Sequence, residues 1–227
     1  MNENKAREEI CRVGKSLFER GYVHASAGNI SVRLPDGFLI TPTDACLGFL
    51  DPADLAKLDA DGNYVSGDKP SKTIVLHQRI YRAARAFDSN SACVIHTHSS
   101  ACVALSLQQP CAADAQELLP ALTPYFVMKV GHVPVIPYHR PGSADAAALV
   151  EKAINDYGNR GTAIRAVMLE RLGPNVWHDT PAAAMATLEE LEETAKLWLG
   201  CKQQSLSTQP LTPDQLCELR ETFGARW

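Results

Sequence analysis

The sequence predicts an α/β or α+β fold built on a mixed β-sheet with helices packed against it. Two β-hairpins occur in the first 70 residues, at the turns Pro35-Asp36-Gly37 and Asp61-Gly62. Helical periodicity recurs along the rest of the chain, between short apolar runs of strand length. Hairpins and helices are mixed without a strict strand–helix alternation, which disfavours an all-parallel sheet.

Length and charge narrow the class of protein. The chain has 227 residues, 45% of them hydrophobic, and a formal net charge of −4. This length suits one sizeable domain, and no block of Lys and Arg indicates a nucleic-acid partner. No run of 18 apolar residues occurs, and the polar N-terminus lacks a signal core, so we expect a soluble, cytoplasmic protein without a membrane partner. Seven cysteines, an odd number without a Cys-x-x-Cys pair, favour a reducing compartment.

The first half of the chain gives clear element signals. Residues 3–20 carry apolar side chains at helical spacing and end before Gly21. Strands follow on both sides of each hairpin turn, over residues 28–34, 38–41, 55–59 and 64–66. A polar loop then leads into a helix over 73–87, for which Ser71 is the predicted N-cap.

The second half alternates short strands and helices. We expect a central strand over 92–97, a helix over 99–107 and a loop region over 110–120. Further strands are predicted at 125–130, 133–137, 166–169 and 176–178, and helices at 144–155, 180–199 and 211–223. Thr180 and Thr212 are N-caps, each followed by proline. The acidic run 189–193 is interpreted as a solvated helix face.

A pair of histidines on the central strand indicates a metal site. His96 and His98 are two residues apart, so in a strand both side chains point to one face. Zinc accepts imidazole nitrogen, and a catalytic zinc has three protein ligands and one open position. Isolated surface or hydrogen-bonded histidines are the alternative.

Polar residues at strand and loop ends predict an anion pocket. Asn29 and Thr43 offer side-chain donors from adjacent strand ends, next to Asp44. Ser71 and Lys72 precede a helix N-terminus, which attracts anions. Turn chemistry and ordinary helix capping explain the same residues without a ligand.

Five motifs in this order resemble the class II aldolases, the group that includes fuculose-phosphate aldolase, ribulose-phosphate 4-epimerase and adducin heads. They are Gly28-Asn29-Ile30-Ser31, Thr41-Pro42-Thr43, Pro70-Ser71-Lys72, His96-Thr97-His98 and Glu189-Glu190-Leu191-Glu192. The phrases beginning at Thr41, Gly67 and Tyr125 look most like one branch, the 3-oxo-tetronate 4-phosphate decarboxylases.

The resemblance implies an α/β three-layer fold, with a mixed, mostly antiparallel central sheet of nine strands between helical layers. It implies a single domain over 1–227, with a core over about 5–200 and a helical tail over 210–227. It further implies a C4-type homotetramer with a zinc site near a subunit interface.

The resemblance also implies roles for individual residues. Asn29, Thr43, Ser71 and Lys72 would bind a substrate phosphate, and His96 and His98 would bind the metal. Tyr125 from a neighbouring subunit would be a proton donor.

Two positions depart from the family pattern. The acid that follows the serine pair in the aldolases is Thr73 here, which cannot titrate. The third zinc histidine, normally in a His-Gly pair, corresponds to Leu172. The downstream histidines are His132, His139 and His178, of which His132 is favoured as the third ligand.

These departures favour one chemistry over another. Aldol cleavage and epimerisation need groups that move protons at carbon. Loss of CO₂ from a β-keto acid needs an electron sink at the ketone, which zinc supplies. We therefore expect metal-dependent decarboxylation of a 3-oxo-tetronate 4-phosphate to dihydroxyacetone phosphate. A class II sugar-phosphate aldolase or 4-epimerase is the alternative, and a metal-free adducin-like binding protein is a second alternative.

Overall fold

A computed structural model describes residues 1–108 and 117–227 as an eight-stranded sheet with helices on both faces. The strand order is β4-β3-β2-β1-β5-β8-β7-β6, and every neighbouring pair is antiparallel except β6–β7. The strands are β1 Asn29–Leu34, β2 Gly37–Ile40, β3 Ala56–Asp59, β4 Tyr64–Ser66, β5 Cys93–His96, β6 Val135–Ile136, β7 Ala166–Leu169 and β8 Gly173–His178. The mixed, mostly antiparallel sheet is confirmed, with eight strands in the described part where the resemblance implied nine.

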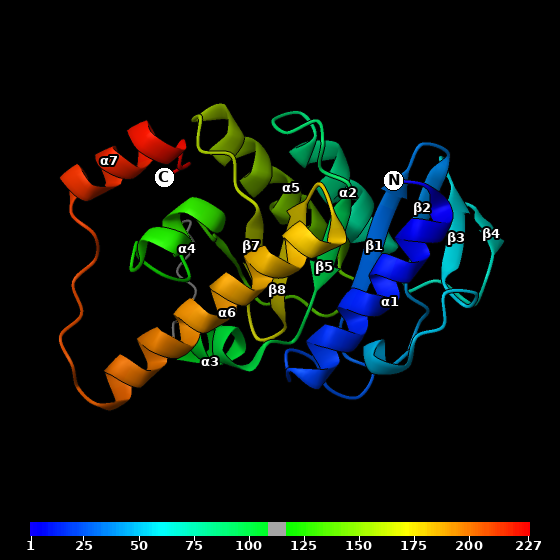
Figure 1. The fold of residues 1–227 in the computed structure, drawn as a ribbon, viewed down its shortest axis with the longest axis horizontal. Coiled ribbons are helices and arrows are strands. Elements are labelled where there is room, and N and C mark those ends of the chain that lie inside the picture. The colour runs from blue at the N-terminus through cyan, green and yellow to red at the C-terminus, as the bar shows by residue number, and fades with distance from the viewer. Residues whose placement is uncertain (109–116) are drawn as a thin grey trace.

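The sheet is the middle of three layers (Figure 1). One core lies between the sheet and α1, α3, α4 and α6, while a second lies between the opposite face and α2 and α5. Their bounds are α1 Glu3–Glu19, α2 Ile74–Ala84, α3 Ser100–Gln108, α4 Pro124–Lys129, α5 Ala144–Asn159 and α6 Pro181–Gln203. The three-layer arrangement is therefore confirmed.

The C-terminal helix α7, Pro213–Phe223, packs beside α4 at one end of the molecule (Figure 1). Thr212 and Gln215 form a reciprocal capping box at its start. In the described part of the chain, no helix combines the length and apolar character required to cross a bilayer.

Three local predictions are wrong. The predicted strand at 125–130 is instead helix α4 with its C-cap Val130, because Thr123 caps the N-terminus and Pro124 occupies the first turn. Helix α2 begins after Thr73, so Ser71 is not its N-cap. β8 begins at Gly173, three residues before the predicted start. The predicted loop 110–120 lies largely outside the described residues.

The acidic run on α6 is not simply solvated. Glu192 is buried and its carboxylate accepts the backbone N–H groups of Ala101 and Cys102, at 2.9 and 3.0 Å. The first N–H groups of α3 have no partner within their own helix, so this carboxylate caps them from a different element. Glu192 thus fixes the start of α3, directly after the strand and turn that carry the histidine pair.

Gly173 allows β8 to approach the end of β5. A Cβ at this position would lie 1.9 Å from the Thr97 carbonyl oxygen, and its φ of +142° is unfavourable for other residues. Next to it, the Thr97 N–H donates to the Pro174 carbonyl at 3.3 Å. The close approach to Thr97 and the positive φ therefore require a glycine at this position, whichever residue precedes it.

Candidate active site

Three polar side chains lie in a row across the central strands. His96 on β5 pairs with Asn29 on β1 and with Asn175 on β8, so the three side chains share one face of the sheet. Val94 and Trp177 belong to the core beneath α2 and α5, which places the row on that face. All three side chains of the row are at most 6% exposed.

The row forms the floor of a pocket of about 570 Å³. Strand ends surround one side, and the N-terminal ends of α2 and α5 form the other. The lining includes the predicted substrate-binding residues Asn29, Thr43, Asp44, Ser71 and Lys72. It also includes Thr73 and two of the three predicted metal ligands, His96 and His98. A volume of this size suits a small metabolite.

The two histidines are neutral, and both line the pocket. Burial, together with His98, lowers the pKa of His96 to about 4, and burial and His24 lower the pKa of His98. The Nδ1–H of His96 donates to the Pro174 carbonyl at 3.0 Å, which leaves Nε2 with a free lone pair. The ring centroids of His96 and His98 are 5.1 Å apart. A backbone partner on one ring nitrogen is the usual arrangement of a metal-binding histidine.

Three of the four predicted phosphate-binding residues, Thr43, Ser71 and Lys72, come from two loops that hold each other in place. The Thr43 N–H donates to the Lys69 carbonyl at 2.9 Å, and the Ser71 N–H donates to the Thr41 carbonyl at 3.2 Å. Lys72 is exposed and makes no ion pair within the described residues. The pocket wall therefore combines hydroxyl donors, an amide and an unpaired cation at a helix start.

Thr73, which the resemblance matches to the acid of the aldolases, lines the pocket next to Ser71. Its hydroxyl and that of Ser71 are 2.9 Å apart, and both line the pocket. A threonine hydroxyl can donate and accept hydrogen bonds, but it cannot serve as a titrating base at neutral pH. The wall beside the histidine pair is thus polar without a carboxylate at this point.

Two predicted residues lie away from the pocket of their own chain. His132 contacts Glu117, with 3.1 Å between Nδ1 and Oε1, and its ring stacks on Trp227 with centroids 4.3 Å apart. These partners explain His132 as a packing residue, and the structure does not bring it to the histidine pair. Tyr125 is 63% exposed at the start of α4 and also lies outside this pocket.

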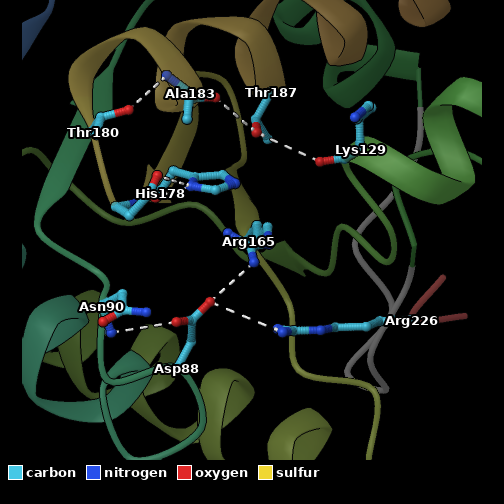
Figure 2. A network of polar contacts seen from close by, with 10 residues as sticks. Asp88, Asn90, Lys129, Arg165, His178, Thr180, Ala183, Thr187 and Arg226 are labelled. Atoms are coloured by element: carbon cyan, nitrogen blue, oxygen red, sulfur yellow. Dashed lines mark hydrogen bonds and ion pairs between the residues drawn. The ribbon is translucent and has the colours of Figure 1, made fainter. Parts of the chain in front are cut away.

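Of the other two downstream histidines, His178 lies away from the pocket and His139 lines it. His178 belongs to a polar network with Asp179, beside Arg165 and Asp88 (Figure 2). His178 and Arg165 line a different hollow. His139 does line the pocket, with Nδ1 2.7 Å from the Pro137 carbonyl oxygen. In the described ranges, no three His, Cys, Asp or Glu side chains are grouped so that they could hold a metal.

Sequence reasoning missed several residues that line the pocket: Arg79, Arg140, Glu170 and Asn175. Asn175 had a usable signal, because it alternates with Trp177 along a strand. The predicted strand began too late to include it. Arg79 and Arg140 come from α2 and from the turn before α5, so only the tertiary fold brings them together.

The donors around the histidine pair fit a divalent metal. His96 and His98 offer neutral imidazoles, and the buried Asn175 offers an amide without a hydrogen-bond partner in the described structure. Zinc and similar ions accept imidazole nitrogen, and divalent ions also accept amide oxygen.

Comparison with known proteins decides the family. Residues 8–199 match the family model described as the class II aldolase and adducin N-terminal domain. The chain belongs to the class II aldolase and adducin family. Class II aldolases generally depend on a divalent metal.

Relatives of this class II aldolase-family chain include decarboxylases and aldolases. A 3-oxo-tetronate 4-phosphate decarboxylase from Cupriavidus necator is 53% identical, and the match covers 99% of each chain. An Escherichia coli protein of the same description is 41% identical over 96% of each. The crystal structure of an E. coli putative aldolase/epimerase/decarboxylase superposes with a TM-score of 0.82 at 39% identity, covering 96% of this chain and 99% of the other.

Proposed function

We propose that this protein decarboxylates a 3-oxo-tetronate 4-phosphate, releasing CO₂ and dihydroxyacetone phosphate. The observation that carries the proposal is Thr73, which replaces a carboxylate in a pocket that retains two neutral histidines and the phosphate-side residues. The names of the C. necator and E. coli relatives support the same substrate.

The reaction breaks the bond between C1 and C2 of the substrate. The electron pair moves from that bond through C2 to the C3 oxygen, and C2 then takes a proton to give the ketone product. A divalent metal held by His96 and His98 would polarise the C3 carbonyl. The chain's own part is to hold the phosphate end with Asn29, Thr43, Ser71 and Lys72, with Asp44 at the rim. No base at carbon is required, so Thr73 does not impair the reaction.

The test compares substrates of the two reaction classes. The zinc-loaded protein is incubated with 3-oxo-4-phosphotetronate and, separately, with fuculose and ribulose phosphates. We expect CO₂ and dihydroxyacetone phosphate from the first substrate alone. The ketose phosphates carry no carboxylate, and their cleavage needs a base that Thr73 cannot supply. Thr73→Glu, which restores an aldolase-type acid, should not raise the rate of CO₂ release.

Two outcomes would replace this proposal. Cleavage of ketose phosphates to an aldehyde by the parent protein would favour the aldolase or epimerase reading. A parent protein that binds no metal and turns over neither class of substrate would favour an adducin-like binding role.

We also propose a cytoplasmic homotetramer in which Tyr125 enters the pocket of a neighbouring subunit. Tyr125 is exposed and remote from its own pocket, so it can donate a proton only to another copy.

Light scattering should give four times the chain mass. Tyr125→Phe should lower kcat by about 100-fold, the lower end of general acid catalysis, without changing metal content. A fully active monomer would contradict this arrangement.

A further inference from the structure

Unpartnered polar atoms in the described structure cluster around His96. Four buried side-chain atoms lack a hydrogen-bond partner: Asn29 Oδ1, His77 Nε2, and both Oδ1 and Nδ2 of Asn175. A buried polar group without a partner is destabilising, so several of them at one site indicate a place for a ligand. Asn175 is the extreme case, because it is fully buried and neither end of its amide is used.

The strand register places Asn175 close to His96. The Thr97 N–H donates to the Pro174 carbonyl, so the adjacent His96–Asn175 pair is of the non-hydrogen-bonded type. Cα atoms in such a pair are about 4.5 Å apart, and the side chains stand closer than in the alternating hydrogen-bonded pairs. Both side chains line the same pocket.

Asn29, on the other side of His96, is placed differently. The Arg33 N–H donates to the Ala92 carbonyl at 2.8 Å, and in this register Asn29–His96 falls on a hydrogen-bonded pair. The Cα separation in that type is about 5.5 Å. Only one of the Asn29 amide atoms is buried without a partner. Asn29 is therefore the natural comparison for Asn175, with the same chemistry at a wider spacing.

His77 is not placed to be a third metal ligand beside His96 and His98. Its Nδ1 lies 2.8 Å from Ser31 Oγ, and burial lowers its pKa to about 3. His77 lies on α2 and does not line the pocket. Leu172, where the family carries its third histidine, is apolar and packs with the α2 and α5 core. Neither residue supplies a third donor to the pair.

We infer that the amide oxygen of Asn175 is the third protein ligand of a divalent metal held by His96 and His98. The inference rests on the metal pair of the proposed function and adds the ligand that replaces the missing histidine. Three neutral ligands leave the full double charge on the ion, and they leave a fourth position open toward the pocket. Binding of a metal by its amide also explains why an asparagine occupies a fully buried position of β8.

The test measures metal binding without substrate. The metal-free protein is titrated with Co²⁺, whose visible absorption reports the ligands, and Zn²⁺ affinity is obtained by competition. Asn175→Leu should weaken binding of both ions by about tenfold or more, since loss of even an outer-shell partner has this effect. Asn175→Asp keeps the shape and adds a charge, so it should bind more tightly than the parent and alter the Co²⁺ spectrum. Asn29→Leu is the matched control and should change affinity by less than about threefold.

The outcomes separate the inference from the function it rests on. Circular dichroism checks that each variant is folded, and Asn175→Asp keeps the test valid if the leucine variant does not fold. Unchanged affinity and spectrum in both Asn175 variants would overturn the inference while leaving the metal pair intact. A parent protein that binds neither Co²⁺ nor Zn²⁺ would overturn the metal pair itself. Leu172→His added to Asn175→Leu should restore affinity, because it returns a third donor beside the pair.

Discussion

Replacing His96 and His98 together by alanine is expected to reduce bound divalent metal to background and kcat/KM by at least about 10³-fold. Both imidazoles lie at the end of the central strand and line the same pocket. Burial keeps them neutral, so they retain the lone pairs that a metal needs. Electrostatic stabilisation of a developing oxyanion is worth 10²–10³ for a single donor, and a metal contributes more. Elemental analysis and steady-state kinetics measure the two effects.

A third histidine provides the control for this experiment. His24 is exposed and its ring centroid is 6.4 Å from that of His98, yet it does not line the pocket. His24→Ala should keep the metal content of the parent protein. A folded double variant of His96 and His98 with unchanged metal content would refute the assignment of this pair.

Lys72→Ala is expected to lower kcat/KM for the phosphorylated substrate by up to about 100-fold. Hydrogen bonds to charged groups contribute about 1.5–3 kcal/mol, and Lys72 adds its charge at the N-terminal end of α2. The loss should be specific to the phosphate, because Thr73, Ser71 and the histidine pair are unchanged. Comparison of phosphorylated and dephosphorylated substrates measures it.

Lys69 is the matched control, since it lies in the same loop, is exposed and does not line the pocket. Lys69→Ala should leave kcat/KM for the phosphorylated and for the dephosphorylated substrate near the values of the parent. If Lys72→Ala discriminates between the two substrates as well as the parent does, the phosphate site must lie elsewhere in the pocket.

Local patterns predicted the part of the fold that local interactions determine. The hairpin turn of Pro35-Asp36-Gly37 and the alternation around it predicted the two antiparallel strands that the structure forms as β1 and β2. The i, i+2 spacing of His96 and His98 predicted a shared strand face. Strand β5 ends at His96, so His98 lies just past it, and both side chains line one pocket. These features depend on residues a few positions apart, where sequence spacing is informative.

The error at α4 came from weighing composition over capping. Tyr125–Val130 is rich in β-branched and aromatic residues, which favour strands. Thr123 followed by Pro124 is a helix start, and in the structure Thr123 Oγ1 accepts the Phe126 N–H at 3.0 Å. The local cap and packing against α6 and α7 outweighed intrinsic propensity.

Other features depend on partners that are remote in sequence. The solvated interpretation of the acidic run is wrong for Glu192 because its partners on α3 are 91 and 90 residues away. His132 as a third metal ligand stays a prediction without support from the geometry, since its partners are Glu117, Tyr157 and Trp227. The division into a core over 5–200 and a tail over 210–227 also stays a prediction.

The buried thiol of Cys93 makes the central strand accessible to kinetic measurement. Cys93 begins β5, three residues before His96, and burial raises its pKa well above the usual range. A thiol in that state reacts with an alkylating reagent only when the strand opens. Exposed Cys217 reacts without opening and gives the reference rate. The rate of Cys93 alkylation, relative to that of Cys217, therefore measures how often β5 separates from its neighbouring strands. A lower rate with metal bound would show that the ion stabilises the closed strand.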